Sequence, residues 1–155
     1  LDVKVSFHPG QFCVLASDTP DIVERSIEEF EYHADMARWM GFGKTFQDGC
    51  KINVHISGRQ GPDGVRRALP KLSQEARNLI TIENDEMGHG LEKSLELEKD
   101  LALVLDIHHH WIRDEEYIEP TDDRVKRVID SWRGQRPSMH YSYSRDEHLA
   151  VAGLG

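Results

Sequence analysis

The sequence predicts an α/β protein built on a parallel sheet, and two observations carry this prediction. Short β-type segments alternate along the 155 residues with longer segments of helical periodicity, which is the pattern of strands joined by right-handed helical crossovers. Segment 101–105 is an unbroken apolar run that ends at Asp106, as expected of a strand buried on both faces. This order fits either a doubly wound sheet or part of a (β/α)₈ barrel. No predicted strand is followed by the G-x-G-x-x-G motif of a dinucleotide site.

Five segments are predicted as strands because they are short, rich in β-branched and apolar residues, and bounded by polar or turn residues. They are 3–7, 51–56, 79–83, 101–106 and 136–141. Four segments with apolar residues at helical spacing separate them. They are 19–41, 62–78, 91–99 and 121–132. The first helix has Thr19 as N-cap and Pro20 at its first position, and it ends at Gly41.

The composition is that of an ordinary globular protein with a formal charge of −9. This charge argues against a general polyanion binder, whose binding face is basic. It does not exclude a metal-dependent enzyme acting on nucleic acid, because bound ions neutralise the carboxylates of their site. No apolar run approaches the roughly 20 residues of a membrane-spanning helix. Cys13 and Cys50 do not make a disulfide framework, so we expect reduced thiols and a cytoplasmic protein without membrane association.

A residue of metal-ligand type stands at the carboxyl end of every predicted strand. These residues are His8, His55, Glu83, Asp106 and His140, with His109 in the loop expected after Asp106. The carboxyl ends of parallel strands form the edge where α/β sites are built. A lone histidine there is more often structural than a ligand, but five strand ends in succession predict a site for several ions. A mixed histidine and carboxylate set suits Zn²⁺, Mn²⁺ or Fe²⁺, and Glu83 and Asp106 are predicted as the catalytic carboxylates that bridge ions for hydrolysis.

Two loop positions give weaker predictions. Gln11 and Phe12 lie at the mouth of the expected site, where they would either enter a nucleic-acid stack as a wedge or only pack the loop. Arg59 and Arg145 lie in loops, where they would either contact DNA phosphates or form solvated surface. Spacing alone leaves both alternatives open for each pair.

Four motifs together resemble the UV damage endonucleases, a family of the TIM-barrel apurinic endonuclease superfamily. The motifs are His8-Pro9-Gly10-Gln11-Phe12, Asn53-Val54-His55, Ile82-Glu83-Asn84-Asp85 and Val104-Leu105-Asp106-Ile107-His108-His109. The resemblance implies about five βα units of an incomplete (β/α)₈ barrel. It also implies a DNA-repair enzyme that incises the phosphodiester backbone 5′ of UV photoproducts or other damaged sites by metal-activated water. The implied partners are damaged double-stranded DNA and two or three divalent ions, with Mn²⁺ expected, Zn²⁺ and Fe²⁺ as alternatives, and no nucleotide cofactor.

The resemblance also assigns roles to single residues. One metal would be held by His8, His55 and Glu83, a second by Glu83, Asp106 and His140, and a third by His109 with His148. Gln11 and Phe12 match the pair that probes the lesion from the intact strand, in which the second position is Tyr in some members. Of the three successive histidines, His109 is therefore the expected ligand, and its two neighbours have supporting roles.

The chain also departs from the family pattern. Family members have further strands and a histidine ligand before His8, a last strand with a glutamate ligand, and in many cases a lysine where this chain has Ser138. We therefore expect residues 1–155 to form a single partial barrel domain without the N-terminal strands and the last strand. Its open sheet edges would allow association into an oligomer, and its activity would be weak or absent. The alternatives are a metal-dependent sugar isomerase or epimerase of the same superfamily, which needs one ion, and an inactive metal-binding fragment.

Overall fold

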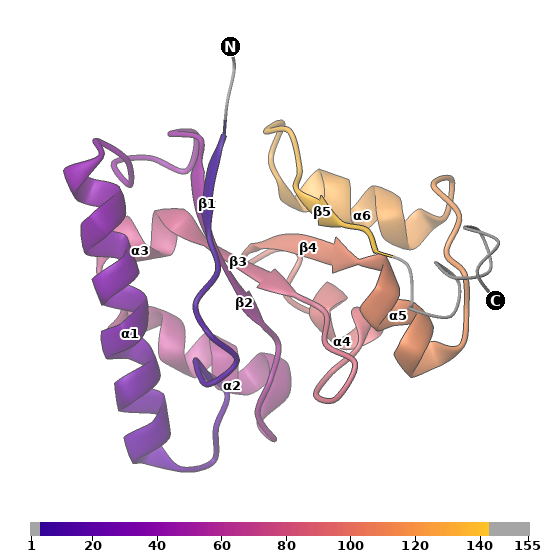
Figure 1. Cartoon of the computed structure of the whole chain (residues 1–155), viewed down its shortest axis with the longest axis horizontal. Helices are drawn as coiled ribbons and strands as arrows, with labels where there is room; N and C mark the ends of the chain where they lie inside the picture. Colours follow the sequence, from indigo (N-terminus) through magenta and orange to yellow (C-terminus); the bar gives the residue numbers. More distant parts are fainter. Residues whose placement is uncertain (1–3, 143–155) are drawn as a thin grey trace, which may run out of the picture.

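The computed structural model describes residues 4–142 and contains one sheet of five parallel strands. The strands are β1 (Val5–Phe7), β2 (Cys50–His55), β3 (Ile80–Glu83), β4 (Ala102–Asp106) and β5 (Met139–His140). Their order in space equals their order in the chain, and the sheet curls into a half-barrel (Figure 1). The prediction of a parallel α/β sheet with barrel-type order is confirmed.

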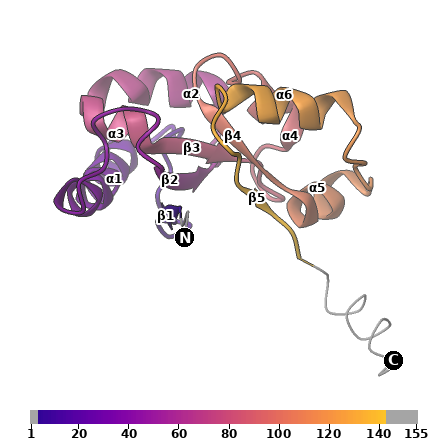
Figure 2. The ribbon, with the colours of Figure 1, turned by 90° about the horizontal axis from the view of Figure 1, so that it is seen from above.

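Six α-helices and a short 3₁₀ helix connect the strands. They are α1 (Pro20–Trp39), α2 (Gly61–Ala68), η1 (Leu69–Lys71), α3 (Gln74–Leu79), α4 (Leu91–Leu95), α5 (Ile107–Asp114) and α6 (Asp123–Ser131). Seen from above, α1, α2, α3, α4 and α6 follow the outside of the curved sheet (Figure 2). Within residues 4–142, no helix has both the length and the apolar character required to cross a bilayer.

The two faces of the sheet differ in chemistry because side chains alternate along each strand. The outer face carries apolar residues that form the main core with the helices, among them Ile52, Ile82 and Leu103. On the inner face, the Thr81 hydroxyl donates to the Asn53 side-chain oxygen at 3.0 Å, although both residues are buried. The half-barrel therefore has an apolar exterior under its helices. Its interior is polar at Asn53 and Thr81, whereas Ala102 and Val104 of β4 form a small apolar cluster with Trp132 there.

The predicted helix 62–78 is wrong as a continuous element. Pro70 lies in η1, after which Leu72 is extended, and α3 begins only beyond Ser73. Pro70 has no backbone N–H to donate and its ring disfavours a continuous α-helix. The Ser73 hydroxyl then accepts from the Ala76 amide at 3.1 Å, so a new N-cap restarts the helix.

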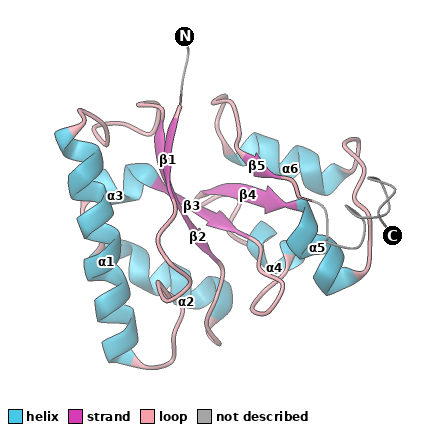
Figure 3. Ribbon diagram, in the orientation of Figure 1, coloured by secondary structure: helices cyan, strands magenta, loops and turns pink. Residues whose placement is uncertain are grey.

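The loop expected after Asp106 is also wrong, because α5 follows β4 directly (Figure 3). Asp106 itself is the N-cap, and its Oδ1 accepts from the His109 amide at 2.9 Å. This arrangement fixes the three histidines on a helix, where successive residues point in different directions. His109 consequently faces the strand ends, whereas His110 is buried beneath the helix.

Candidate metal centre

Glu83, the last residue of the central strand β3, lies at the centre of the site. It is fully buried, and imidazole rings surround its carboxylate. The contacts run from Oε1 to His140 Nδ1 (2.8 Å) and His109 Nδ1 (3.8 Å), and from Oε2 to His8 Nε2 (3.2 Å) and His55 Nε2 (3.5 Å). Four histidines from β2, β5, α5 and the end of β1 thus converge on one carboxylate.

The register of the sheet explains this convergence. His55 pairs with Glu83 across β2 and β3, and Asp106 pairs with His140 across β4 and β5. Each of these residues ends its strand, so the parallel arrangement brings the side chains to one edge. The rings of His8 and His140, from opposite ends of the sheet, stack with centroids 6.0 Å apart. The curl of the sheet is therefore large enough to close the site over Glu83.

The ligand atoms form two groups that share Glu83. In each group the atoms lie within 4.8 Å of one another. One group is His8, Glu83 and His140, and the other is His55, Glu83 and His109. The resemblance instead paired His8 with His55 and placed Asp106 with His140, so the grouping in the structure differs. Asp106 belongs to neither group of ligand atoms, and the expected ligand His148 lies outside the described residues.

The negative charge of Glu83 and the neighbouring histidines shift one another's pKa values. Burial alone would raise the pKa of Glu83, but hydrogen bonds and charge interactions with the histidines outweigh it and hold that pKa well below its usual range. The hydrogen bond to Glu83 raises the pKa of both His8 and His140. Burial lowers the pKa of His55. The pocket therefore stabilises a carboxylate and attracts positive charge around it.

The donor set fits a divalent cation. The Nδ1–H of His8 donates to the Pro9 carbonyl at 3.0 Å, which aims Nε2 at Glu83. The Nδ1–H of His109 likewise donates to the Asn84 carbonyl at 3.0 Å, so Nε2 is the ring nitrogen that could bind an ion. Ligating histidines are commonly oriented by such a hydrogen bond at the other ring nitrogen. Imidazole nitrogens and a bridging carboxylate are ligands for Zn²⁺, Mn²⁺ and Fe²⁺.

Asp106, the second predicted carboxylate, lies next to this set. Its Oδ2 is 3.8 Å from His140 Nδ1 and 3.9 Å from His109 Nε2. The buried Asn84 side chain fixes its backbone, since Nδ2 donates to the Asp106 carbonyl at 2.9 Å and Oδ1 accepts from the Asp106 amide at 2.8 Å. Asp106 thus lies between two histidines, one from each group.

Three neighbouring residues were not predicted as part of the site. Asn53 donates from Nδ2 to Glu83 Oε2, Asn84 orients Asp106, and Glu86 places Oε2 3.0 Å from His109 Nε2. Asn53 lies two residues before His55, so strand alternation could have found it on the same face. No spacing rule places Glu86, because it belongs to the loop after β3.

The predicted DNA contacts are divided by the structure. Gln11 and Phe12 line an open pocket of about 280 Å³ together with His55 and Glu86, and Phe12 is 79% exposed. Both predicted probes therefore border the metal-ligand set. Arg59 lies apart from that pocket, highly exposed, with Nη1 3.8 Å from Asp18 Oδ2. Arg145 and His148 lie outside the described residues.

Comparison with known proteins finds relatives along nearly the whole chain. The chain is 29% identical to a UV DNA damage endonuclease of Bacillus velezensis, over 94% of this chain and 47% of that protein. It is 31% identical to a putative UV-damage endonuclease of Acanthamoeba polyphaga mimivirus, over 90% and 44%. The crystal structure of SacUVDE superposes with a TM-score of 0.77 at 29% identity, over 92% of this chain and 49% of that one.

The chain spans about half the length of the curated relatives it matches. The family model for UV-endonuclease UvdE matches residues 1–151. A match of this extent, on a fold shared with a solved relative, shows that the chain belongs to the UV-endonuclease UvdE family.

Proposed function

We propose that this chain carries the metal centre of a DNA-repair endonuclease that incises the backbone 5′ of UV photoproducts or other damaged sites in double-stranded DNA. The observation that supports it most is the buried Glu83 carboxylate, contacted by four histidines at the carboxyl edge of the sheet. Burying a charged carboxylate contributes little net stability even when it is paired. Stability of the fold alone therefore does not explain four imidazole partners around Glu83. Relatives named as UV-damage endonucleases point to the same chemistry.

The proposed cofactor is two or three divalent ions, with Mn²⁺ preferred over Zn²⁺ or Fe²⁺. His8, Glu83 and His140 would hold one ion and His55, Glu83 and His109 another, with Asp106 between the groups and His148 as a further ligand. Such ions lower the pKa of water and stabilise negative charge developing at phosphorus. The two sets share one carboxylate, which favours ions spaced for backbone cleavage.

The chain's own side chains have separate roles in this proposal. Glu83 and Asp106 are the catalytic carboxylates, and the surrounding imidazoles orient them by contacts of 2.8–3.9 Å. Gln11 and Phe12 at the rim contact the DNA beside the damage, and Arg59 with Arg145 contacts phosphates. Both described cysteines are free and buried, which agrees with a reducing cytoplasmic location.

The direct test is incision of a UV-irradiated, end-labelled duplex by the chain, with Mn²⁺ and with EDTA. We expect Mn²⁺-dependent nicks immediately 5′ of photoproducts and none in unirradiated DNA. Glu83→Gln should abolish the nicks. The matched control is Glu98→Gln. Glu98 lies in the segment after α4, and its carboxylate pairs with Arg127 of α6 at 2.6 Å. Because weak activity is expected of a partial barrel, the chain is used in excess over the DNA. Incision that persists in Glu83→Gln, or that is absent from the wild type even at this excess, would contradict the proposal.

Metal stoichiometry separates this proposal from a sugar isomerase or epimerase. The isomerase alternative requires one ion per chain, whereas two groups of ligand atoms around Glu83 favour at least two. Elemental analysis of the chain after dialysis against Mn²⁺ gives this number. Two or more ions without incision would indicate a metal-binding unit that has lost or never had the activity.

A further inference from the structure

Glu86 belongs to the loop between β3 and α4, and its carboxylate reaches the metal centre from that loop. Glu86 Oε2 lies 3.0 Å from Nε2 of His109. The other nitrogen of that ring, Nδ1, already donates to the Asn84 carbonyl at 3.0 Å. The Glu86 carboxylate therefore contacts the ring nitrogen that could bind an ion.

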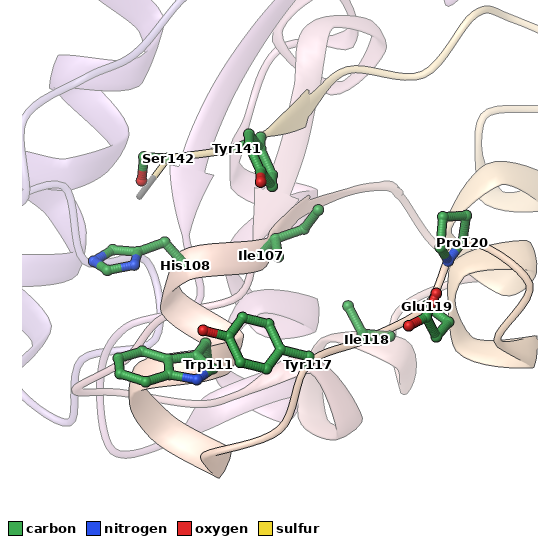
Figure 4. Close-up of a pocket in the computed structure, with 9 residues that line it drawn as sticks. All are labelled: Ile107, His108, Trp111, Tyr117, Ile118, Glu119, Pro120, Tyr141 and Ser142. Atoms are coloured by element: carbon green, nitrogen blue, oxygen red, sulfur yellow. The ribbon is translucent and has the colours of Figure 1, made fainter. Parts of the chain in front are cut away.

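This contact depends on the direction in which His109 leaves α5. Figure 4 shows His108 and Trp111 of the same helix beside a separate pocket of about 330 Å³. The Asp106 carboxylate caps the helix at the His109 amide, at 2.9 Å, which fixes the rotation of the first turn. Consecutive helical residues point about 100° apart, so His109 faces Glu86 while His108 points elsewhere.

Three carboxylates surround the His109 ring. Oxygen atoms of Glu83, Asp106 and Glu86 lie 3.8, 3.9 and 3.0 Å from its nitrogens. Carboxylates gathered around one group repel one another. A protonated imidazole supplies a single positive charge, whereas a divalent ion supplies two. The charge balance around His109 therefore favours a bound divalent ion over a simple ion pair with Glu86.

The separations agree with ligands of one ion. Ligands about 2.1 Å from an ion lie about 3.0 Å apart at a right angle and about 3.4 Å apart at a tetrahedral angle. The 3.0 Å from Glu86 to His109 matches the lower value, and the 3.9 Å from Asp106 to the same nitrogen needs a wider angle. Glu86 lies outside both groups of ligand atoms around Glu83, but its side chain is 31% exposed, which leaves it room to adjust.

The backbone that carries Glu86 is held by neighbouring segments. Arg113 of α5 donates from Nη1 to the Glu86 carbonyl at 3.2 Å. The Asp85 amide donates to the His89 carbonyl at 3.0 Å, and the His89 amide donates to the Ile56 carbonyl at 3.3 Å. The loop is therefore closed on itself and tied to the chain just beyond β2, so Glu86 loses little conformational freedom when it binds.

An open pocket of about 280 Å³ lies beside Glu86. Glu86 lines it together with His55, Gln11 and Phe12. An ion bound by Glu86 would border this space, which leaves coordination positions for water or a substrate oxygen, as catalytic metal sites require.

We propose that Glu86 is a further metal ligand and binds, with Asp106, the ion held at Nε2 of His109. This inference rests on the proposed function, because it adds one residue to the same centre. Neither the strand-end rule nor the family resemblance assigned a role to Glu86. The alternative role is an ion pair that only orients the His109 ring.

The test is titration with Mn²⁺, in which free Mn²⁺ is measured by electron paramagnetic resonance. We expect Glu86→Gln to weaken one class of site by at least about 10-fold, since losing a residue that only orients a ligand already costs that much. The control Glu98→Gln, outside the ligand groups, should match the wild type. Melting temperatures in EDTA show that each variant is folded.

A second variant separates ligation from charge. Glu86→His offers a neutral ring nitrogen as ligand, and histidine suits Co²⁺. We expect Glu86→His to bind Co²⁺ about as tightly as the wild type and Glu86→Gln to bind it at least about 10-fold more weakly, measured by visible absorption. A histidine would not restore a carboxylate that acts only through its charge.

Two results would overturn the ligand role. One is identical Mn²⁺ isotherms for the wild type and Glu86→Gln. The other is a weaker isotherm in Glu86→Gln without recovery of Co²⁺ binding in Glu86→His, because Glu86 then acts through its charge.

Incision of UV-irradiated DNA is assayed with the same preparations. Incision by the wild type, together with an isotherm that does not depend on Glu86, overturns the ligand and leaves the proposed function standing. A site that depends on Glu86 and recovers in Glu86→His, without incision, supports the ligand and contradicts the proposed function. A wild type that binds no Mn²⁺ overturns both.

Discussion

The substitution Glu83→Gln tests the metal centre most sharply, because Glu83 belongs to both groups of ligand atoms. Glutamine keeps the size of the side chain and removes its charge. In the metal-free protein two effects oppose each other, since the substitution removes the cost of burying a carboxylate together with its contacts to His8 and His140. We therefore expect only a small change in melting temperature when EDTA is present.

The expected effect on metal binding is much larger. An ion present at 100 times its dissociation constant stabilises the folded state by about 2.7 kcal/mol, which raises the melting temperature of a domain of this size by roughly 5–10 °C. Losing even a residue that orients a ligand costs about 10–100-fold in metal affinity, so losing the shared carboxylate of Glu83 should cost at least about 100-fold. At the same Mn²⁺ concentration the stabilisation then falls to about 0.4 kcal/mol, or roughly 1 °C.

The assay is thermal unfolding of the wild type and Glu83→Gln, each with EDTA and with Mn²⁺ at 100 times the wild-type dissociation constant. The control Glu98→Gln should keep the full shift, because Glu98 pairs with Arg127 away from the ligand groups. An equal Mn²⁺-induced shift in Glu83→Gln and the wild type would refute the reasoning. Mn²⁺ would then bind at a place that does not include Glu83.

Three further predictions concern residues and strands that support the site. Asn84→Ala leaves the buried backbone N–H and carbonyl of Asp106 without their partners, so the free energy of unfolding measured in urea should fall by about 2–3 kcal/mol. Mn²⁺ titration should show an affinity about 10–100-fold weaker. Unchanged values would show that Asn84 does not hold Asp106 in place. Burial lowers the pKa of Lys51 to about 8, so between that pH and about 10.4 the unfolded chain binds more protons than the folded one. The free energy of unfolding should therefore rise with pH across this window, by at most about 3 kcal/mol relative to Lys51→Met. Urea denaturation that gives the same pH dependence for both proteins would contradict this prediction. Saturating Mn²⁺ should slow amide exchange in β1 and β5 more than in β3, because His8 and His140 tie the edge strands to the centre; uniform protection in exchange mass spectrometry would speak against that tie.

The positions of the candidate ligands could be predicted from the sequence because a parallel sheet follows a simple geometric rule. Each strand ends at the same edge, so a histidine or carboxylate at each strand end must meet the others, whatever the connecting helices do. His55, Glu83, Asp106 and His140 are all confirmed as the last residues of their strands. The resemblance added the choice of His109 among three neighbours, and that side chain does face Glu83 and Asp106.

The residues that orient the ligands could not be predicted in the same way. Asn84 acts through contacts with the backbone of Asp106, 22 residues away, and no local pattern encodes that partner. The α5 helix was missed because three histidines in succession carry no apolar period, whereas the signal that starts the helix is the Asp106 side chain itself. The grouping of ligand atoms depends on ring orientation, which strand positions alone do not determine.

The central position of Glu83 explains how a sheet of five strands can gather four histidines around one carboxylate. Glu83 ends β3, which has two strands on either side. His8 and His55 approach its carboxylate from one side, and His109 and His140 approach from the other. A flat sheet would hold the ends of β1 and β5 four strand spacings apart, at roughly 19 Å, yet the rings of His8 and His140 stack at 6.0 Å. The curl of the sheet and the ligand cluster therefore depend on each other, and a cation bound at Glu83 would stabilise the curvature that creates its own site.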